Sequence, residues 1–369
     1  MAIRKIEDQS RRYQIIWDLG RRCTYACSYC PPHRNNKWSP MANLDELKST
    51  LDDVVEYALL YDEFRNVPSL KKVSFTGGEP TANPIFTDFL RYMKQTYPDF
   101  SRGVTTNGWF SDKKADELME LSTGGTVSYH CESTDEQKKQ VVKNCIRMKD
   151  KYKVNVMFHN QYFEECIRVT DTLNAAGVEF VPRIIGDDHP DDKKSTELGY
   201  TQVYDREQMK WMRNYWREKG QEVNDSGFGR PCCGGRKFLH NGKESTFLTD
   251  TNFYGWNCMV NWYFLFLNQE ADRVWTHQTC GVNLNGDVAP LGKISEFDKI
   301  IETLADDLYQ KRVPMITCPK THCGCGMCIT KSKDIGEMFD RHTHDLTYYD
   351  MPISTKEHIT TKQVINALV

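Results

Sequence analysis

The sequence lacks any long apolar run. No stretch reaches the roughly 20 apolar residues that a membrane-spanning helix needs, and the first thirty residues hold no apolar core of a secretion signal. An excess of charge of one sign is also missing, because 48 Lys and Arg stand against 51 Asp and Glu and leave a formal net charge of −3. Such a balance gives no global basic field for nucleic acid. We therefore expect a soluble, cytoplasmic protein without a membrane or nucleic-acid partner.

Cysteine, by contrast, is abundant. The chain has 14 cysteines, and without an export signal metal ligation accounts for them better than disulfides. Three cysteines lie between residues 23 and 30, and eight lie after residue 230. The other three, Cys131, Cys145 and Cys166, are scattered through the middle and predict small buried side chains. The two clusters indicate metal chemistry.

The first cluster is the triplet Cys23, Cys27 and Cys30, a Cys-x3-Cys-x2-Cys pattern that follows an apolar strand at residues 13–19. A four-iron cluster usually takes four Cys thiolates, so a triplet leaves one iron without a protein ligand. Zinc and ordinary buried thiols are the alternatives. Zinc sites more often show paired Cys-x2-Cys knuckles or added His. The triplet therefore predicts a [4Fe-4S] cluster with one iron open to another ligand.

A second motif lies about fifty residues further on. Residues 73–80 read Val-Ser-Phe-Thr-Gly-Gly-Glu-Pro, a short β-rich run that ends in two glycines and an acid. Gly77 and Gly78 allow close approach of the backbone to a ligand. Glu79 can accept hydrogen bonds from an ammonium group. The plain alternative is a turn that ends a strand at Pro80.

Together the two motifs resemble the signature of the radical S-adenosylmethionine (SAM) enzymes. The resemblance implies that SAM chelates the open iron and that the quartet at residues 77–80 binds its amino group. It also implies that SAM is cleaved to methionine and a 5′-deoxyadenosyl radical, which abstracts hydrogen from an unactivated C–H bond. An external electron donor such as flavodoxin or ferredoxin would supply the electron.

The resemblance extends to residues at other strand ends. Tyr29 matches the aromatic residue that neighbours adenine, and Thr105, Asn107 and Ser128 match positions that contact the ribose or carboxylate of SAM. Each could equally be a packed aromatic, a turn residue or a cap.

Three further side chains are candidates for catalysis. His130, His159 and Arg183 close predicted strands and would point towards the cavity. Any of them could bind substrate or transfer a proton, since His titrates near neutrality. A structural hydrogen bond is the alternative for each.

The first 220 residues alternate between strand-like and helix-like segments, which predicts an α/β fold with a parallel sheet. The resemblance implies a partial (β/α)6 barrel over residues 1–220, with ligands at the carboxyl ends of its strands. We expect strands at residues 13–19, 72–76, 103–106, 126–130, 154–159 and 178–183, and helices at 44–61, 84–95, 112–121, 134–149, 164–175 and 205–218.

Residues 221–335 predict a cysteine-rich second domain, followed by a tail at 336–369. A hairpin is expected at 262–267 and 273–279, and a helix at 297–312. The cysteines around and after the hairpin look like the SPASM or twitch appendages of radical SAM enzymes, which hold auxiliary clusters. One auxiliary [4Fe-4S] cluster is predicted; two clusters, or a zinc ion in the terminal knuckle, are alternatives. The candidate ligands are Cys258, Cys280, Cys318, Cys323, Cys325 and Cys328, and Cys232 and Cys233 are either ligands or packed thiols.

These features favour an oxidoreductase that acts on a small molecule. A maturase that cross-links or epimerises a ribosomal peptide is a second reading, although strand one begins near residue 13 and leaves no room for a preceding peptide-recognition domain. A nucleoside-modifying enzyme is a third reading, which no phosphate loop or basic run favours. An iron–sulfur electron carrier or a zinc-stabilised binding module would leave the quartet at residues 77–80 unexplained.

Overall fold

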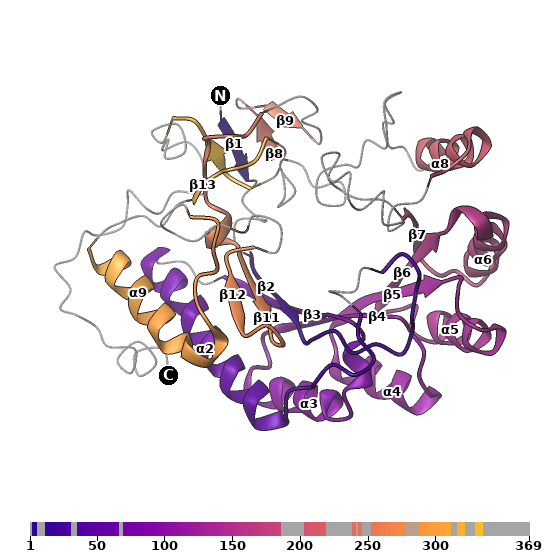
Figure 1. Cartoon of the computed structure of the whole chain (residues 1–369), viewed down its shortest axis with the longest axis horizontal. Coiled ribbons are helices and arrows are strands. Elements are labelled where there is room, and N and C mark those ends of the chain that lie inside the picture. The colour runs from indigo at the N-terminus through magenta and orange to yellow at the C-terminus, as the bar shows by residue number, and fades with distance from the viewer. Residues whose placement is uncertain are drawn as a thin grey trace. The chain divides into compact units, whose positions relative to one another are not determined.

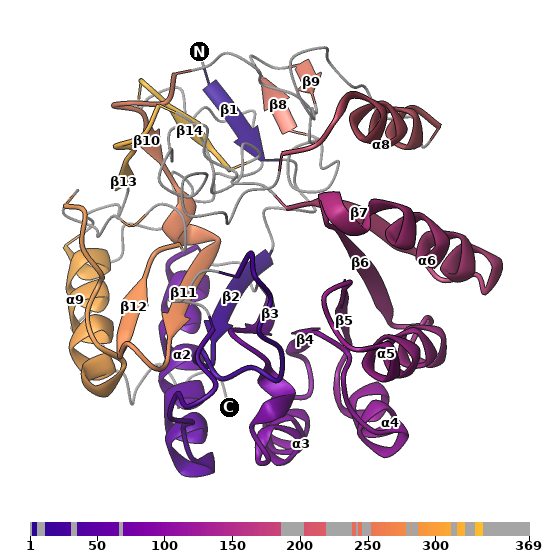
Figure 2. The same ribbon diagram turned by 45° about the vertical axis from the view of Figure 1, so that its right-hand side comes forward.

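The structure is a computed structural model that describes most of the chain in two compact units. The first unit comprises Met1–Ile16, Asp45–Lys72 and Gly229–Val369, and the second comprises Trp17–Leu44 and Val73–Phe228. Figures 1 and 2 trace the chain. The residues described are 2–5, 12–30, 35–65, 69–185, 203–218, 238–240, 243–245, 252–277, 281, 287–310, 316–321 and 329–334.

The second unit is an α/β layer, as the sequence predicts. Neighbouring strands β4, β5, β6 and β7 pair in parallel, and helices α3, α4, α5 and α6 lie along one side of them (Figure 2). The elements are β3 Leu70–Thr76, α3 Phe86–Thr96, β4 Ser101–Thr106, α4 Asp112–Leu121, β5 Gly124–His130, α5 Asp135–Arg147, β6 Tyr152–Phe158, α6 Phe163–Ala175, β7 Phe180–Ile184 and α8 Arg206–Glu218. The first three residues of β3 belong to the first unit, and β3 begins two residues before the predicted strand. β7 begins two residues later and ends one residue later than predicted.

Alternation along the strands gives the sheet an apolar face and a polar face. On β5 and β6, Val127, Tyr129, Val154 and Val156 are buried, because successive side chains of a strand point to opposite faces. The intervening positions are mostly polar, as at Ser128 and Asn155, and Met157 is apolar. In register, His130 pairs with Met157, and Met157 pairs with Arg183. This polar face therefore presents the strand-end residues that the sequence singles out.

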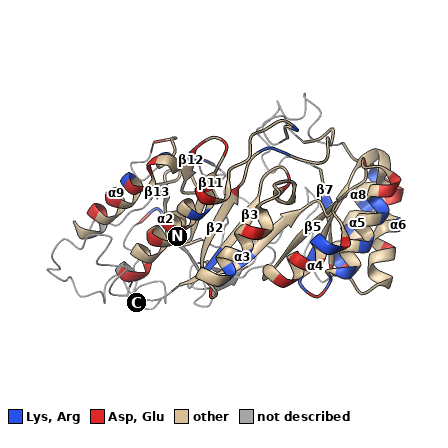
Figure 3. Cartoon of the chain, turned by 90° about the horizontal axis from the view of Figure 1, so that it is seen from below, with Lys and Arg blue, Asp and Glu red and all other residues tan. Residues whose placement is uncertain are grey.

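Local signals set the helix ends of this unit. The Ser111 hydroxyl accepts a hydrogen bond from the Lys114 amide at 3.3 Å and caps α4. Thr134 forms a capping box with Gln137 at the start of α5. Gly177 ends α6 with a φ of +69°, the left-handed conformation that glycine adopts without strain. Acidic and basic side chains both lie along α4 and α5 (Figure 3).

The first unit contains a second, antiparallel sheet. Its strand order is β13-β10-β14-β1-β8-β9. The strands are β1 Ala2–Lys5, β8 Phe238–His240, β9 Lys243–Ser245, β10 Asn257–Cys258, β13 Ile316–Thr317 and β14 Lys331–Ser332, and the helices of the unit are α2 Leu44–Arg65 and α9 Phe297–Tyr309. α2 extends four residues beyond the predicted helix.

The expected hairpin is present in the first unit. β11 Phe264–Asn268 pairs antiparallel with β12 Arg273–Trp275, and Asp272 takes a positive φ of 51° in the turn between them. β11 lies beside β2 Arg12–Asp18, and the Gln14 amide donates to the Tyr263 carbonyl at 2.8 Å. The complete strand order is β12-β11-β2-β3-β4-β5-β6-β7, so the hairpin adds two strands to the six that the sequence predicts.

Tyrosines fill the core between β2 and α2 in the first unit. Tyr13 stacks on Tyr61 with ring centroids 5.7 Å apart, and Tyr61 lies edge-on to Trp262 at 5.3 Å. Both tyrosines are fully buried. Among the described helices, none is long and apolar enough to cross a membrane. The predicted domain boundary near residue 220 and the tail at 336–369 fall outside the described residues and stay predictions.

Candidate functional site

The cysteine triplet lies in a loop that leaves the carboxyl end of β2. Cys23, Cys27 and Cys30 are each partly exposed, and a turn is closed by the Cys30 amide, which donates to the Cys27 carbonyl at 3.1 Å. Two N–H groups point at the Cys23 sulfur, from the Tyr25 amide at 3.4 Å and from Asn107 Nδ2 at 3.8 Å. Such donors to thiolate sulfur are among the features that tune iron–sulfur centres.

In the metal-free loop, the surroundings of Cys23 and Cys27 favour the protonated thiol over the thiolate. Burial raises the pKa of the Cys23 thiol, and it raises the pKa of Cys27 to about 12, with the nearby Glu132 carboxylate adding to the increase. A bound cation reverses this balance and deprotonates a coordinating thiol. Within the described residues, no three His, Cys, Asp or Glu side chains converge on a single ion position. Three cysteine thiolates are a donor set that an iron–sulfur cluster takes.

The glycine pair packs against the start of the cysteine loop. The Gly78 amide donates to the Gly20 carbonyl at 2.7 Å, and the Glu79 amide donates to the Arg22 carbonyl at 2.7 Å. A Cβ placed on Gly78 would lie 2.3 Å from the Arg22 carbonyl oxygen, and Gly77 has a φ of +133°. In the structure the two glycines thus allow close approach of the chain's own backbone.

Glu79 is buried, and its carboxylate accepts hydrogen bonds from residues that follow β3 and end β4. It is 4% exposed. Its Oε1 accepts hydrogen bonds from Thr106 Oγ1 at 2.7 Å and from the hydroxyl and amide of Thr81 at 2.6 and 3.0 Å. Its Oε2 accepts one hydrogen bond, from the Asn107 amide at 2.6 Å. Burial raises the pKa of the Glu79 carboxyl, and these hydrogen bonds oppose that increase.

The Asn107 side chain links the Glu79 hydrogen bonds to the cysteine loop. Its side-chain Nδ2 donates to Thr24 Oγ1 at 2.9 Å, next to Cys23, while its Oδ1 accepts from the Trp109 amide at 3.0 Å. The ends of β3 and β4 are therefore tied to the triplet by one amide side chain.

Tyr29 and two histidines meet across the polar face. The Tyr29 hydroxyl and His130 Nδ1 are 2.5 Å apart, and the Tyr29 ring lies 6.1 Å from the His159 ring. Burial lowers the pKa of His130 to about 4, which Glu132 partly opposes, so the imidazole is neutral near pH 7. In a neutral imidazole one ring nitrogen donates and the other accepts, so the direction of the hydrogen bond between Tyr29 and His130 follows from the His130 tautomer.

Glu132 is a site residue that the sequence reasoning missed. It lies two residues beyond the end of β5, and its carboxylate accepts hydrogen bonds from both the amide and the hydroxyl of Ser28. Its Oε1 is also 3.6 Å from His159 Nε2. Because His159 Nδ1 accepts from the Gln161 amide at 3.2 Å, the imidazole proton faces Glu132. The sequence feature that could have identified Glu132 is its place just after a predicted strand, two positions after His130.

The remaining predicted residues lie on the polar face but further apart. Thr105 on β4 is exposed and Ser128 on β5 is partly exposed. Ser128 pairs in register with Asn155. Arg183 donates from Nε to Asn155 Oδ1 at 3.3 Å. Their roles towards SAM or substrate stay predictions.

Comparison with known proteins identifies this unit. Residues 17–194 match the model of the radical SAM superfamily. This segment of the chain belongs to that superfamily. Membership implies a [4Fe-4S] cluster and SAM binding, and the donor set of the triplet fits such a cluster.

Curated relatives of the radical SAM domain match shorter segments. The chain is 28% identical over 100 residues to a GTP 3′,8-cyclase of Nautilia profundicola, covering 27% of this chain and 29% of that protein. It is 30% identical over 90 residues to human molybdenum cofactor biosynthesis protein 1, covering 24% of this chain and 13% of that protein. The matches thus span less than a third of these relatives.

Two of the solved structures to which the chain is similar have S-adenosylmethionine bound. Streptococcus suis SuiB bound to S-adenosylmethionine gives a TM-score of 0.49 at 14% identity, covering 82% of this chain and 68% of that one. The anSMEcpe protein with bound AdoMet gives 0.45 at 12% identity, covering 79% and 77%.

Two of the predicted auxiliary ligands lie outside the radical SAM domain, on neighbouring strands of the antiparallel sheet. Asn257 pairs with Thr317, and the Cys318 amide donates to the Trp256 carbonyl at 2.8 Å. Cys318 directly follows β13, and Cys258 pairs in register with Ile316, two residues before Cys318. Cys280, Cys323, Cys325 and Cys328 lie outside the described residues, as do Cys232 and Cys233.

The scattered cysteines of the radical SAM domain are core residues. Cys131, Cys145 and Cys166 are each at most 1% exposed, which confirms the sequence prediction.

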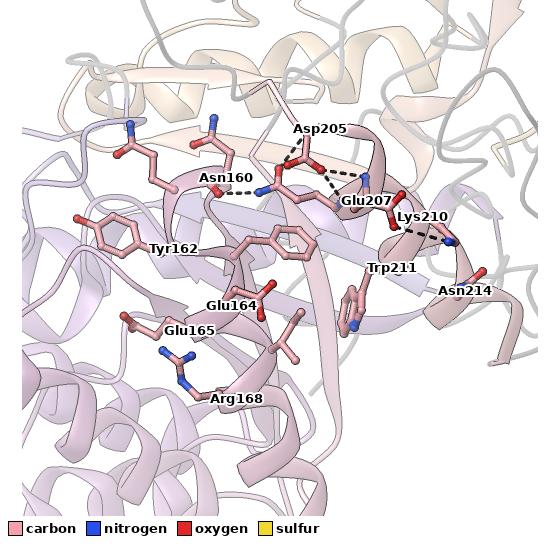
Figure 4. Close-up of a pocket in the computed structure, with 14 residues that line it drawn as sticks. Asn160, Tyr162, Glu164, Glu165, Arg168, Asp205, Glu207, Lys210, Trp211 and Asn214 are labelled. Atoms are coloured by element: carbon pink, nitrogen blue, oxygen red, sulfur yellow. Dashed lines mark hydrogen bonds and ion pairs between the residues drawn. The ribbon is translucent and has the colours of Figure 1, made fainter.

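A surface cavity of about 590 Å³ lies where α6 begins and faces α8 (Figure 4). Its lining includes Asn160, Arg168, Asp205 and Trp211. Several of its polar groups bond to each other or to nearby backbone, as Asn160 Nδ2 does to the Val203 carbonyl at 2.9 Å. None of the predicted SAM residues lines it.

Proposed function

We propose that this protein reductively cleaves SAM and uses the resulting 5′-deoxyadenosyl radical to abstract hydrogen from an unactivated C–H bond. Cys23, Cys27 and Cys30 would hold the cluster, which supplies the electron that breaks the carbon–sulfur bond of the sulfonium. The single observation that carries the proposal is the link from the Glu79 network through Asn107 to Thr24 and Cys23. It joins both sequence motifs in one site.

The same network supports a role for Glu79 in binding SAM. Among the described residues, Oε1 takes three donors, whereas Oε2 takes one, the Asn107 amide. A carboxylate oxygen has about two acceptor positions, so Oε2 keeps one for an ammonium donor. Tyr29 lies on the same polar face, in reach of the adenine that the family places there.

The substrate that we favour is a small molecule that undergoes two-electron oxidation. An auxiliary cluster, with Cys258 and Cys318 among its ligands, would accept the electron that remains after hydrogen abstraction. The position of Cys258 in β10 and of Cys318 directly after its partner strand β13 supports this proposal, and a zinc ion in the terminal knuckle at residues 318–328 is the rival. Flavodoxin or ferredoxin would reduce the protein.

A nucleotide substrate is the second candidate. It is favoured by the similarity to GTP 3′,8-cyclases over about a quarter of the chain. That similarity spans less than a third of those enzymes, so the substrate itself must be tested. A ribosomal peptide remains the third reading.

The deciding experiment measures iron, sulfide and zinc in anaerobically reconstituted protein, together with 5′-deoxyadenosine formed from SAM and dithionite. We expect about eight irons with SAM cleavage. About four irons plus one zinc would make the second site structural. Cys27→Ala should abolish 5′-deoxyadenosine formation, while Cys145→Ala, a buried cysteine away from the loop, should not.

Two results would contradict the proposal. One is 5′-deoxyadenosine formation that persists in Cys27→Ala, and the other is absence of iron and cleavage in competently reconstituted wild type. Addition of GTP separates the substrate classes, because a nucleotide enzyme should form 5′-deoxyadenosine faster when GTP is present.

A further inference from the structure

One carboxylate reaches from the end of β5 into the cysteine loop. Glu132 Oε2 accepts the Ser28 amide at 2.7 Å, and Glu132 Oε1 accepts the Ser28 hydroxyl at 2.6 Å. Ser28 lies between Cys27 and Cys30, and Glu132 is 104 residues away in sequence. The loop segment that presents two of the three thiols is therefore held by both carboxylate oxygens of one side chain.

The two hydrogen bonds between Ser28 and Glu132 are solvent-exposed, and they are distinguished by their charge and by their pairing. Hydrogen bonds to an ionised acceptor are shorter and stronger than neutral ones, and two together fix orientation as well as distance. Because one bond goes to the backbone and the other to the side chain, Ser28 can neither rotate nor shift without losing at least one of them.

Glu132 is itself held by the sheet. Its Oε1 lies 3.6 Å from His159 Nε2, and the His159 imidazole is oriented by the Gln161 amide. On the other side, the Ser133 hydroxyl donates to the His130 carbonyl at 2.8 Å and fixes the turn that follows β5. Glu132 thus links the residues just after β5, where it lies close to His159, to the cysteine loop.

We propose that Glu132 is a positioning residue for the cluster: it fixes Ser28 so that Cys27 and Cys30 keep the spacing that the irons require, and its charge keeps the cluster's reduction potential low. The inference rests on the proposed function. A negative charge near an iron–sulfur centre disfavours the reduced form, which carries one more electron. Holding the loop and setting the potential are therefore separable by mutation.

Two variants separate the two effects. Glu132→Gln removes the charge and one acceptor, because its amide nitrogen donates and cannot accept from Ser28. Ser28→Ala removes the hydroxyl bond but keeps the charge and the amide bond. Glu136→Gln is the matched control, since Glu136 is an exposed acid in the first turn of α5.

The readouts are iron retained against a chelator and the midpoint potential of the SAM-binding cluster, followed by its electron paramagnetic resonance signal. We expect Glu132→Gln to lose iron about 10–100-fold faster than wild type, the range typical of residues that orient metal ligands. Its potential should move upward. Ser28→Ala should lose iron less than about 10-fold faster, with its potential unchanged. The Glu136→Gln control should match wild type in both.

The outcomes distinguish this inference from the proposed function. If wild type holds a cluster and cleaves SAM but Glu132→Gln matches the control in iron retention and potential, the positioning role is overturned. If wild type holds no cluster, the proposed function falls and this inference falls with it. Should Glu132→Gln fail to fold, Glu132→Asp replaces it, because Asp keeps the charge but shortens the reach. Faster iron loss without a change in potential is then expected, and unchanged iron retention would refute the role.

Discussion

Replacing Glu79 by alanine should destabilise the protein strongly, because its carboxylate satisfies donors that water cannot reach. Thr106 and Asn107 are 1% and 4% exposed, and each donates to Glu79 over 2.7 and 2.6 Å. Leaving a buried donor unsatisfied costs about 1–3 kcal/mol, so the two together predict a loss of about 2–6 kcal/mol. That is a large part of the about 5–15 kcal/mol that stabilises a typical protein.

Urea unfolding followed by circular dichroism tests this magnitude. Glu79→Ala should lower the midpoint without changing the slope, which would indicate lost stability and not a changed unfolding transition. Glu79→Gln should lose about half as much, since it keeps an acceptor for Thr106 but turns a donor towards the Asn107 amide. Glu136→Ala, an exposed carboxylate, serves as control. A loss below about 0.5 kcal/mol in Glu79→Ala, the range of ordinary surface changes, would refute the reasoning.

Two further predictions concern the glycine pair and His130. Gly78→Ala should reduce iron incorporation, because its Cβ would lie 2.3 and 2.5 Å from the Arg22 and Arg21 carbonyl oxygens and displace the cysteine loop. Gly177→Ala, at a φ of +69° where the nearest atom to an added Cβ is Lys149 Nζ at 3.9 Å, should lose only about 1–2 kcal/mol of stability and keep full iron content. Equal iron in both variants would contradict the argument. Burial lowers the pKa of His130 from 6.5 to about 4 beside Tyr29 and Glu132. Between these values the unfolded chain binds a proton that the folded chain does not, so the free energy of unfolding should fall by up to about 3 kcal/mol as the pH is lowered through this window. His130→Gln should flatten that slope in urea unfolding of the metal-free protein at several pH values, and an unchanged slope would rule out this residue as its source.

Local sequence patterns predicted the parts of the fold that depend on neighbouring residues. The alternation of strand-like and helix-like segments predicted the α/β order, and the cysteine spacing marked the loop. The Ser28–Glu132 contact was not predictable in this way, because nothing near either residue specifies a partner 104 positions away. Glu79 shows the same limit: its type indicated a binding role, but two of its four donors belong to Thr106 and Asn107, which only the fold brings to it.

Strand end positions were less predictable than strand existence. β7 begins at Phe180, whereas the pattern placed its start at residue 178. The tight αL turn at Gly177 uses Val178, whose amide donates to the Leu173 carbonyl at 2.9 Å, to close α6. The apolar side chain of Val178 therefore favoured a strand in the sequence pattern, whereas its amide closes the carboxyl end of α6.

The pairing of β2 with β11 bears on how the chain can be shortened. A fragment that ends at residue 220 would lose β11 and leave the backbone groups of β2 without partners on that flank, including the Gln14 amide that now meets Tyr263. Its neighbours Tyr13 and Ile15 are fully buried. An exposed, apolar edge strand is a template for intermolecular pairing. Such a fragment would aggregate on expression, even though it contains every residue of the cysteine triplet.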